Sequence, residues 1–369
     1  MNVYEQLIRP AIFRLDAERA HDLAIDVSSR VGDLSYVHSA LSAYLTVADE
    51  RLSTEVAGIR FENPVGLAAG YDKSGRAVDG LASLGFGHIE VGSVSIDPSD
   101  GNPKPRLFRL PEDEAVIVHY GLQNDGARVV RDRLMNRKTN VPVGVNIVKT
   151  NRGSSSPTEC SVDIIDEYVR AVKTLHDCAD YLILNLSCPN TEDGRDFFAE
   201  HVQTRVLLEA LGELPNLKPI FLKVTPLGED AAVESLLVAA DPFEFISGFI
   251  FNLAPGVHAS LRSPESIWRK LPGALAGRPV KNQMNACIGN LYLRMDSVRY
   301  QIIGVGGIST GADAYEKIKL GASMVQILTA LVYRGPGVVK RINVGLCELM
   351  ERDGVTSIAD VVGVDVKKG

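Results

Sequence analysis

The chain has 369 residues, of which 45% are hydrophobic and 23% charged, a mixture typical of globular proteins and not of disordered or collagen-like chains. Its 39 Lys and Arg residues against 46 Asp and Glu residues give a formal net charge of −7, which argues against binding to a nucleic-acid backbone. No run of the sequence reaches the roughly 18–20 apolar residues that a membrane-spanning helix needs.

The first 31 residues have the spacing of two amphipathic helices. Pro10 is expected to kink or divide the first helix, and Asp16 is a good N-cap for a second helix over 17–31. Two interpretations stay open: the pair packs on the main body, or it lies on a membrane surface without crossing the bilayer. The second would make the protein peripheral, through residues 1–31, on the inner face of the cell membrane.

The five cysteines form no C-x-x-C pair and are odd in number, which is typical of reduced thiols. We therefore expect a cytoplasmic protein.

From about residue 56 the chain repeats an apolar run, a Gly-rich or polar turn and a helical stretch. Eight such runs occur, near 65–69, 88–94, 143–148, 181–187, 220–225, 247–253, 301–305 and 324–328. Their number and continuous Val/Ile/Leu character predict a (β/α)8 TIM barrel, with a doubly wound open sheet as the alternative. The predicted division is a helical extension over 1–48 and one barrel domain over 49–369. Two long insertions, 94–124 and 255–300, interrupt the repeat, and the first is expected to form a lobe over the strand ends.

Polar residues follow nearly every run, where the active sites of barrels form. They are Gly70 and Lys73, Ser93, Asn146, Asn185, Lys223, Asn252, Gly306 with Gly307, and Thr329. Gly306, Gly307 and Thr329 fit a phosphate site, because a backbone without Cβ atoms lets N–H groups approach an anion. The alternative is a pair of tight turns.

The string from Asn185 to Asn190 contains Cys188 between two amides and before a proline. A thiol whose unperturbed pKa is about 8.5 can take a proton from carbon after modest tuning, so Cys188 is the candidate general base. Lys73 is a candidate for binding a substrate carboxylate. His119, in the predicted lobe, is a second acid–base candidate, although a loop histidine is more often only solvated.

Together these residues resemble the dihydroorotate dehydrogenase family, specifically its membrane-associated, quinone-reducing class 2. The resemblance is carried by motifs in the family's order along nearly the whole chain. They are residues 13–21 (FRLDAERAH), 63–70 (NPVGLAAG), 72–73 (DK), 85–87 (GFG), 90–94 (EVGSV), 101–109 (GNPKPRLFR), 277–279 (GRP) and 302–308 (IIGVGGI).

The resemblance implies an FMN-containing barrel. It assigns FMN contacts to Ala69, Gly70, Ser93, Asn146, Asn185, Lys223, Gly277, Gly307 and Thr329. It assigns substrate contacts to Lys73, Asn185, Asn190 and Asn252, and it implies that a quinone reoxidises the flavin beneath the N-terminal helices. These are expectations for this chain, with a small molecule as substrate and no nucleic-acid partner.

The chain departs from the class 2 pattern on the substrate side. Cys188 stands where class 2 has Ser, Val118 replaces a substrate-binding Asn, and His119 replaces Arg. Leu253 replaces one residue of a Thr pair, and Leu328 replaces a Tyr. Each lost donor would weaken binding of a polar ring by about 1–3 kcal/mol. Oxidation of dihydroorotate is therefore the default, and a divergent enzyme acting on a less polar dihydro-compound is the alternative.

Two further alternatives are proteins of other functional classes: a flavin-binding protein without catalysis and an RNA-modifying flavoenzyme. A flavin protein without catalysis would not need both Lys73 and Cys188. A dihydrouridine-type RNA enzyme would need a basic surface, against the net charge of −7.

Overall fold

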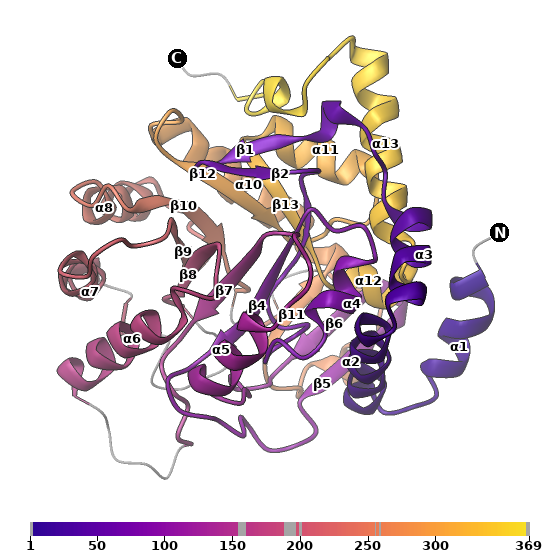
Figure 1. Ribbon diagram of the computed structural model, residues 1–369, viewed down its shortest axis with the longest axis horizontal. Coiled ribbons are helices and arrows are strands. Elements are labelled where there is room, and N and C mark those ends of the chain that lie inside the picture. The colour runs from indigo at the N-terminus through magenta and orange to yellow at the C-terminus, as the bar shows by residue number, and fades with distance from the viewer. Residues whose placement is uncertain are drawn as a thin grey trace.

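The structure is a computed structural model that describes residues 3–153, 160–187, 197–198, 201–254, 256–257 and 260–366. Within these residues, parallel strands close into an eight-stranded barrel that follows the order of the chain (Figure 1). The strands are β3 (Val65–Leu67), β4 (His88–Val94), β7 (Val143–Ile147), β8 (Tyr181–Asn185), β9 (Ile220–Val224), β10 (Ile246–Phe251), β12 (Gln301–Val305) and β13 (Ala322–Ile327). The eight apolar runs thus predicted the barrel correctly, and the open-sheet alternative is wrong.

Helices connect the strands and cover the outside of the barrel. They are α4 (Val78–Ala82), α5 (Ala127–Met135), α6 (Ser161–Leu175), α7 (His201–Gly212), α8 (Asp230–Ala240), α10 (Lys281–Arg294), α11 (Gly311–Lys319), α12 (Thr329–Arg334) and α13 (Val338–Asp353). The short helices are α9 (Glu265–Trp268), η2 (Glu50–Leu52), η3 (Pro111–Asp113), η4 (Arg278–Val280) and η5 (Ile358–Val361).

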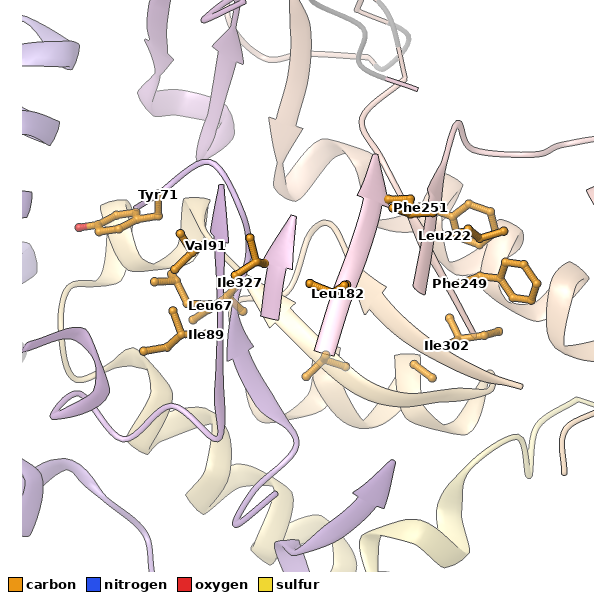
Figure 2. Packing of buried hydrophobic residues seen from close by; sticks show 14 of the residues in the cluster. Leu67, Tyr71, Ile89, Val91, Leu182, Leu222, Phe249, Phe251, Ile302 and Ile327 are labelled. Carbon is orange, nitrogen blue, oxygen red and sulfur yellow. The ribbon is translucent and has the colours of Figure 1, made fainter. Parts of the chain in front are cut away.

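On β8, β9, β10, β12 and β13, alternate residues enter two separate clusters, as a pleated strand requires. Ile89, Leu182 and Phe249 point away from the barrel interior and pack in the large cluster beneath the helices, part of which Figure 2 shows. Tyr181 and Phe221, on the opposite face of their strands, fill the inside of the barrel. Both faces are buried, which explains the continuous apolar runs in the sequence.

A short hairpin, β1 (Thr54–Val56) and β2 (Ile59–Phe61), precedes the first barrel strand. Val56 and Phe61 pack on the interior residues Tyr181 and Phe221, so the hairpin contributes to the interior core. The sequence analysis missed this hairpin because three-residue strands are too short to show a period.

The N-terminal residues form η1 (Tyr4–Ile8), α1 (Arg9–Ile12), α2 (Ala17–Asp33) and α3 (Ser35–Leu45). Pro10 lies in the first turn of α1, where its missing N–H costs no hydrogen bond. Asp16 caps α2 as predicted: its carboxylate accepts from the amides of Glu18 at 3.0 Å and Arg19 at 3.1 Å. Helix α3 was not predicted. Of the described helices, none has both the length and the apolar composition to cross a membrane.

The two long insertions form one structure. Strands β5 (Leu107–Leu110) and β6 (Ala115–Val118) come from the first, and β11 (Ala274–Gly277) comes from the second. They pair as an antiparallel sheet in the order β11-β6-β5. Because the pairing joins segments about 160 residues apart, no local pattern in the sequence predicts it.

Candidate functional site

A cavity of about 1130 Å³ begins at the carboxyl ends of the barrel strands and continues to helices α1–α3. Its inner part is lined by eleven residues that the sequence analysis selected, namely Ala69, Gly70, Lys73, Ser93, Asn185, Lys223, Asn252, Gly277, Gly306, Gly307 and Thr329. Its outer part is lined by apolar side chains of the N-terminal helices, among them Ile12, Leu23 and Val27. One space therefore joins the polar end of the barrel to the N-terminal helices.

Glu90 organises the floor of this cavity. It lies on β4, is fully buried, and accepts on Oε1 from Lys223 Nζ at 2.9 Å and from Asn146 Nδ2 at 2.7 Å. Asn146, which does not line the cavity, thus lies beneath the floor in this network, whereas Lys223 reaches the cavity. Burying an ammonium without a counter-charge costs free energy, so the carboxylate of Glu90 stabilises the charged side chain of Lys223 at the floor of the cavity.

Three side chains form a second network beside the floor. Asn185, at the end of β8, donates through Nδ2 to Ser93 Oγ at 3.0 Å. Asn252 donates through Nδ2 to Asn185 Oδ1 at 3.0 Å and to the carbonyl of Ser187 at 2.9 Å. These bonds fix the orientation of both amides, so each presents a known donor or acceptor to the cavity.

Gly306 and Gly307 both have positive φ, at 87° and 75°, in the turn after β12. A Cβ on Gly306 would lie 2.7 Å from Met284 Cγ, and one on Gly307 would lie 2.4 Å from Lys281 Cβ. The requirement for glycine thus comes from the turn and from close packing on α10. The same turn lines the cavity, so the tight-turn interpretation and the binding-site interpretation are compatible.

Lys73 lies in the loop after β3, with its ammonium 3.9 Å from the centre of the Tyr120 ring. Burial lowers the pKa of Lys73 to about 8, and the carboxylates of Asp22, Asp72 and Glu18 oppose this shift. The side chain is therefore mostly a cation at neutral pH, suited to bind an anionic group in the cavity.

The structure does not describe two of the predicted site residues, and it places a third, His119, away from the cavity lining. Cys188 and Asn190 lie outside the described residues, so their roles stay predictions. His119 is described but is not among the residues that line the cavity: its Nε2 lies 3.1 Å from Asn102 Nδ2. The next residue, Tyr120, lines the cavity instead, and the acid–base role of His119 stays a prediction.

Sequence reasoning gave no role to Glu90, Gln326, Tyr120 or His21, all of which lie at or near the cavity. Glu90 and Gln326 were detectable in principle, since a polar residue inside a buried apolar run needs a partner or a ligand. His21 and Tyr120 gave no such signal, because they lie on a surface-like helix and in a loop.

The family model described as dihydroorotate dehydrogenase matches residues 51–350. The chain is 39% identical over 369 residues to a dihydroorotate dehydrogenase (quinone) of Natronomonas pharaonis, covering 99% of this chain and 100% of the relative. It is 37% identical to the mitochondrial dihydroorotate dehydrogenase (quinone) of Mus musculus, covering 99% of this chain and 91% of the relative.

Among solved structures, the dihydroorotate dehydrogenase of Eimeria tenella in complex with ferulenol superposes with a TM-score of 0.81 at 30% identity. The match covers 95% of this chain and 96% of the other. The family model, the identity over the whole length and the shared fold agree. This chain belongs to the dihydroorotate dehydrogenase family.

Proposed function

We propose that this protein oxidises dihydroorotate to orotate and passes the electrons to a quinone, the activity for which its relatives are named. The observation that carries the proposal is the single cavity, in which the polar end of the barrel continues into an apolar space beneath α1–α3. A polar substrate and an apolar electron acceptor can then use opposite parts of one site.

The inner cavity suits a flat cofactor with hydrogen-bonding groups along one edge, and we infer that this cofactor is FMN. The support is Gln326, which lines the cavity, is 1% exposed, and has no partner among the described residues for either polar atom of its side chain. A buried amide in that position needs a ligand with a donor and an acceptor. Lys223 also lines the cavity and would supply a positive charge to the bound cofactor.

The residues proposed to hold FMN surround the inner cavity and its floor. They are Ala69, Gly70, Ser93, Asn146, Asn185, Lys223, Gly277, Gly306, Gly307 and Thr329. When bound, FMN supplies the two-electron redox centre.

The chain's own residues then bind and orient the substrate. Lys73 binds its carboxylate, and the fixed amides of Asn185 and Asn252 pair with ring carbonyl and N–H groups, joined in the proposal by Asn190. Cys188 is the proposed base that takes a proton from a ring carbon as the double bond forms.

The quinone is proposed to enter beneath the N-terminal helices from a membrane surface. The support is a set of exposed apolar side chains on these helices, including Leu7 at 69%, Leu23 at 48% and Val27 at 51% exposure. Leu23 and Val27 also line the cavity, so they join the outer surface to its apolar part.

The test is an anaerobic titration of purified, FMN-loaded protein with dihydroorotate, followed by addition of a short-chain quinone. We expect loss of the flavin absorbance near 450 nm, about one equivalent of orotate, and return of the colour with quinone. Cys188→Ser should retain FMN and slow the bleaching, most of all near neutral pH. A flavin that stays oxidised with dihydroorotate would contradict the proposal.

The alternative substrate has one observation in its favour. Val118 and Leu253 both line the cavity and present apolar surface where the class 2 pattern has donors. The same titration separates the two: bleaching by a less polar dihydro-compound, but not by dihydroorotate, would favour the alternative.

A further inference from the structure

His21, on the N-terminal helix α2, reaches the loop that carries Lys73. Its Nε2 lies 3.2 Å from Lys73 Nζ, although 52 residues separate the two in the sequence. Both side chains line the cavity. Helix α2 thus contributes a polar group to the part of the cavity proposed for the substrate, in addition to its apolar side chains near the outer part.

Two aromatic rings, those of Tyr71 and Tyr120, support the contact between His21 and Lys73. The His21 ring packs edge-on against Tyr71, with ring centres 5.1 Å apart, and lies 6.4 Å from the Tyr120 ring. Lys73 Nζ lies 3.9 Å from the centre of the same Tyr120 ring, within the range of a cation–π interaction. The ammonium is therefore held between helix α2 and the β6–α5 loop.

The protonation states make His21 an acceptor. Burial lowers the pKa of His21 well below its usual value, and Lys73 and Arg76 lower it further, so the ring is neutral at pH 7. An ammonium can only donate, so Nε2 of the neutral His21 ring must be the accepting nitrogen. Because Nε2 faces Lys73, this favours the tautomer with the proton on Nδ1, and Nε2 then accepts from the ammonium.

We propose that His21 is a positioning residue for Lys73, so that helix α2 sets the affinity of the site for the substrate's carboxylate. This inference rests on the proposed function. An ammonium on a flexible four-carbon chain loses rotamer freedom when it binds an anion, and a side chain already held by His21 and Tyr120 loses less. One of its three N–H donors goes to His21, and two remain for the carboxylate.

The charges around Lys73 fix the expected pH dependence. They come from Glu18 and Asp22 on α2, Asp72 in the same loop, and Arg106 in the β4–β5 segment. Substrate affinity should fall as the pH rises through about 8, where Lys73 loses its proton. Since the bond to His21 favours the charged form of Lys73, its removal should move this fall to lower pH.

The experiment measures the dissociation constant of orotate from the perturbation of the flavin absorbance, without turnover and without quinone. Anaerobic reduction by dihydroorotate in a stopped-flow instrument then separates substrate affinity from the limiting rate. We expect His21→Leu to weaken both affinities about tenfold, with a smaller change in the limiting rate. His21→Gln, whose Oε1 can accept from Lys73, should restore most of the affinity.

A second pair of variants covers the case in which His21→Leu does not fold. Tyr120→Leu should weaken orotate binding, whereas Tyr120→Phe, which keeps the ring, should retain most of it. Asp26→Asn is the matched control on α2, because Asp26 pairs at the surface with Arg76 and does not line the cavity. It should leave orotate affinity unchanged.

The outcomes are distinguishable. If wild-type protein is not reduced by dihydroorotate, the proposed function fails. If wild-type protein is reduced, and His21→Leu binds orotate with unchanged affinity and pH profile, this inference alone is overturned. An effect of His21→Leu confined to reoxidation by quinone would also overturn it, because His21 would then serve only the acceptor.

Discussion

The cavity lies between two regions of different construction: the barrel floor, meaning Lys223 with the buried Glu90 and Asn146 beneath it, and the cap, meaning residues 4–45. The floor residues lie on barrel strands, all are buried, and their bonds stay within the barrel. The cap is a set of helices with several exposed apolar side chains, held to the body by polar contacts between distant segments and by packing of α2 on α4. One wall of the site is thus made of the barrel's own strands, and we expect the other, built from separate helices, to open before the barrel unfolds.

Specific polar contacts hold the cap at both of its ends. Glu18, which is 6% exposed, accepts from Arg106 at 2.8 Å and from Lys104 at 3.1 Å. At the other end, Tyr4 donates its hydroxyl to the carbonyl of Val332 at 2.7 Å, and Arg9 donates to the carbonyl of Tyr333 at 3.0 Å. Attachment therefore depends on individual polar pairs as well as on packing.

The largest expected effect is on the floor. Glu90→Gln keeps an acceptor for Asn146 but removes the counter-charge of Lys223, so it should lower the free energy of unfolding by about 3–5 kcal/mol. Urea denaturation followed by circular dichroism measures this loss. The FMN content after purification should fall as well, because the position of Lys223 is no longer fixed.

The control is the same substitution in an exposed pair. Glu209 contacts Arg205 at 3.0 Å on the surface of α7, where both side chains are more than half exposed. Glu209→Gln should cost only about 0.3–0.5 kcal/mol. Equal losses for the two variants would mean that burial of Glu90 does not matter, and the contrast between floor and surface would be wrong.

The attachment of the cap to the barrel should weaken at low pH. Burial raises the pKa of Glu18, but the hydrogen bonds from Arg106 and Lys104 outweigh burial and bring the pKa below its usual value of 4.5. A lowered pKa means that Glu18 stabilises the cap above pH 4.5 and that this contribution is lost as the pH falls through the lower folded-state value. Limited proteolysis with pepsin should therefore cut within 17–33 increasingly as the pH falls below the usual carboxyl pKa of 4.5, before the barrel unfolds.

Glu18→Gln tests the assignment of this acid response. The variant should be cut within α2 at pH 5 already, with a local loss of about 1–3 kcal/mol, and should show a much weaker response to further acid. Cleavage that begins simultaneously in the cap and in the barrel strands would show that the two regions unfold together.

The sequence predicted the barrel and the helical nature of the cap, including the Asp16 N-cap of α2, but not helix α3 or the contacts that join the cap to the barrel. Strands buried on both faces must be apolar throughout, so eight continuous runs were visible, and the glycine turns and the polar residues after the strands were visible too. Contacts such as Glu18 with Arg106 or His21 with Lys73 join segments far apart in the chain and leave no local pattern. The family resemblance supplied roles for residues such as Lys73 and Asn252, but not the partners that position them.

The smallest effect is the sharpest test of the comparison, because the same change can be made in both regions. Thr310 caps the barrel helix α11 by accepting from the amide of Asp313 at 3.1 Å, and Asp16 caps α2 in the same way. Loss of either cap by substitution with Ala should cost about 1 kcal/mol. Thr310→Ala should lower the global free energy of unfolding by that amount, whereas Asp16→Ala should leave it nearly unchanged and instead speed hydrogen exchange within α2. If Asp16→Ala lowered the global free energy of unfolding as much as Thr310→Ala, the cap and the barrel would unfold as one cooperative unit. His21 would then hold Lys73 from a helix that is fixed to the barrel, not from one that moves independently of it.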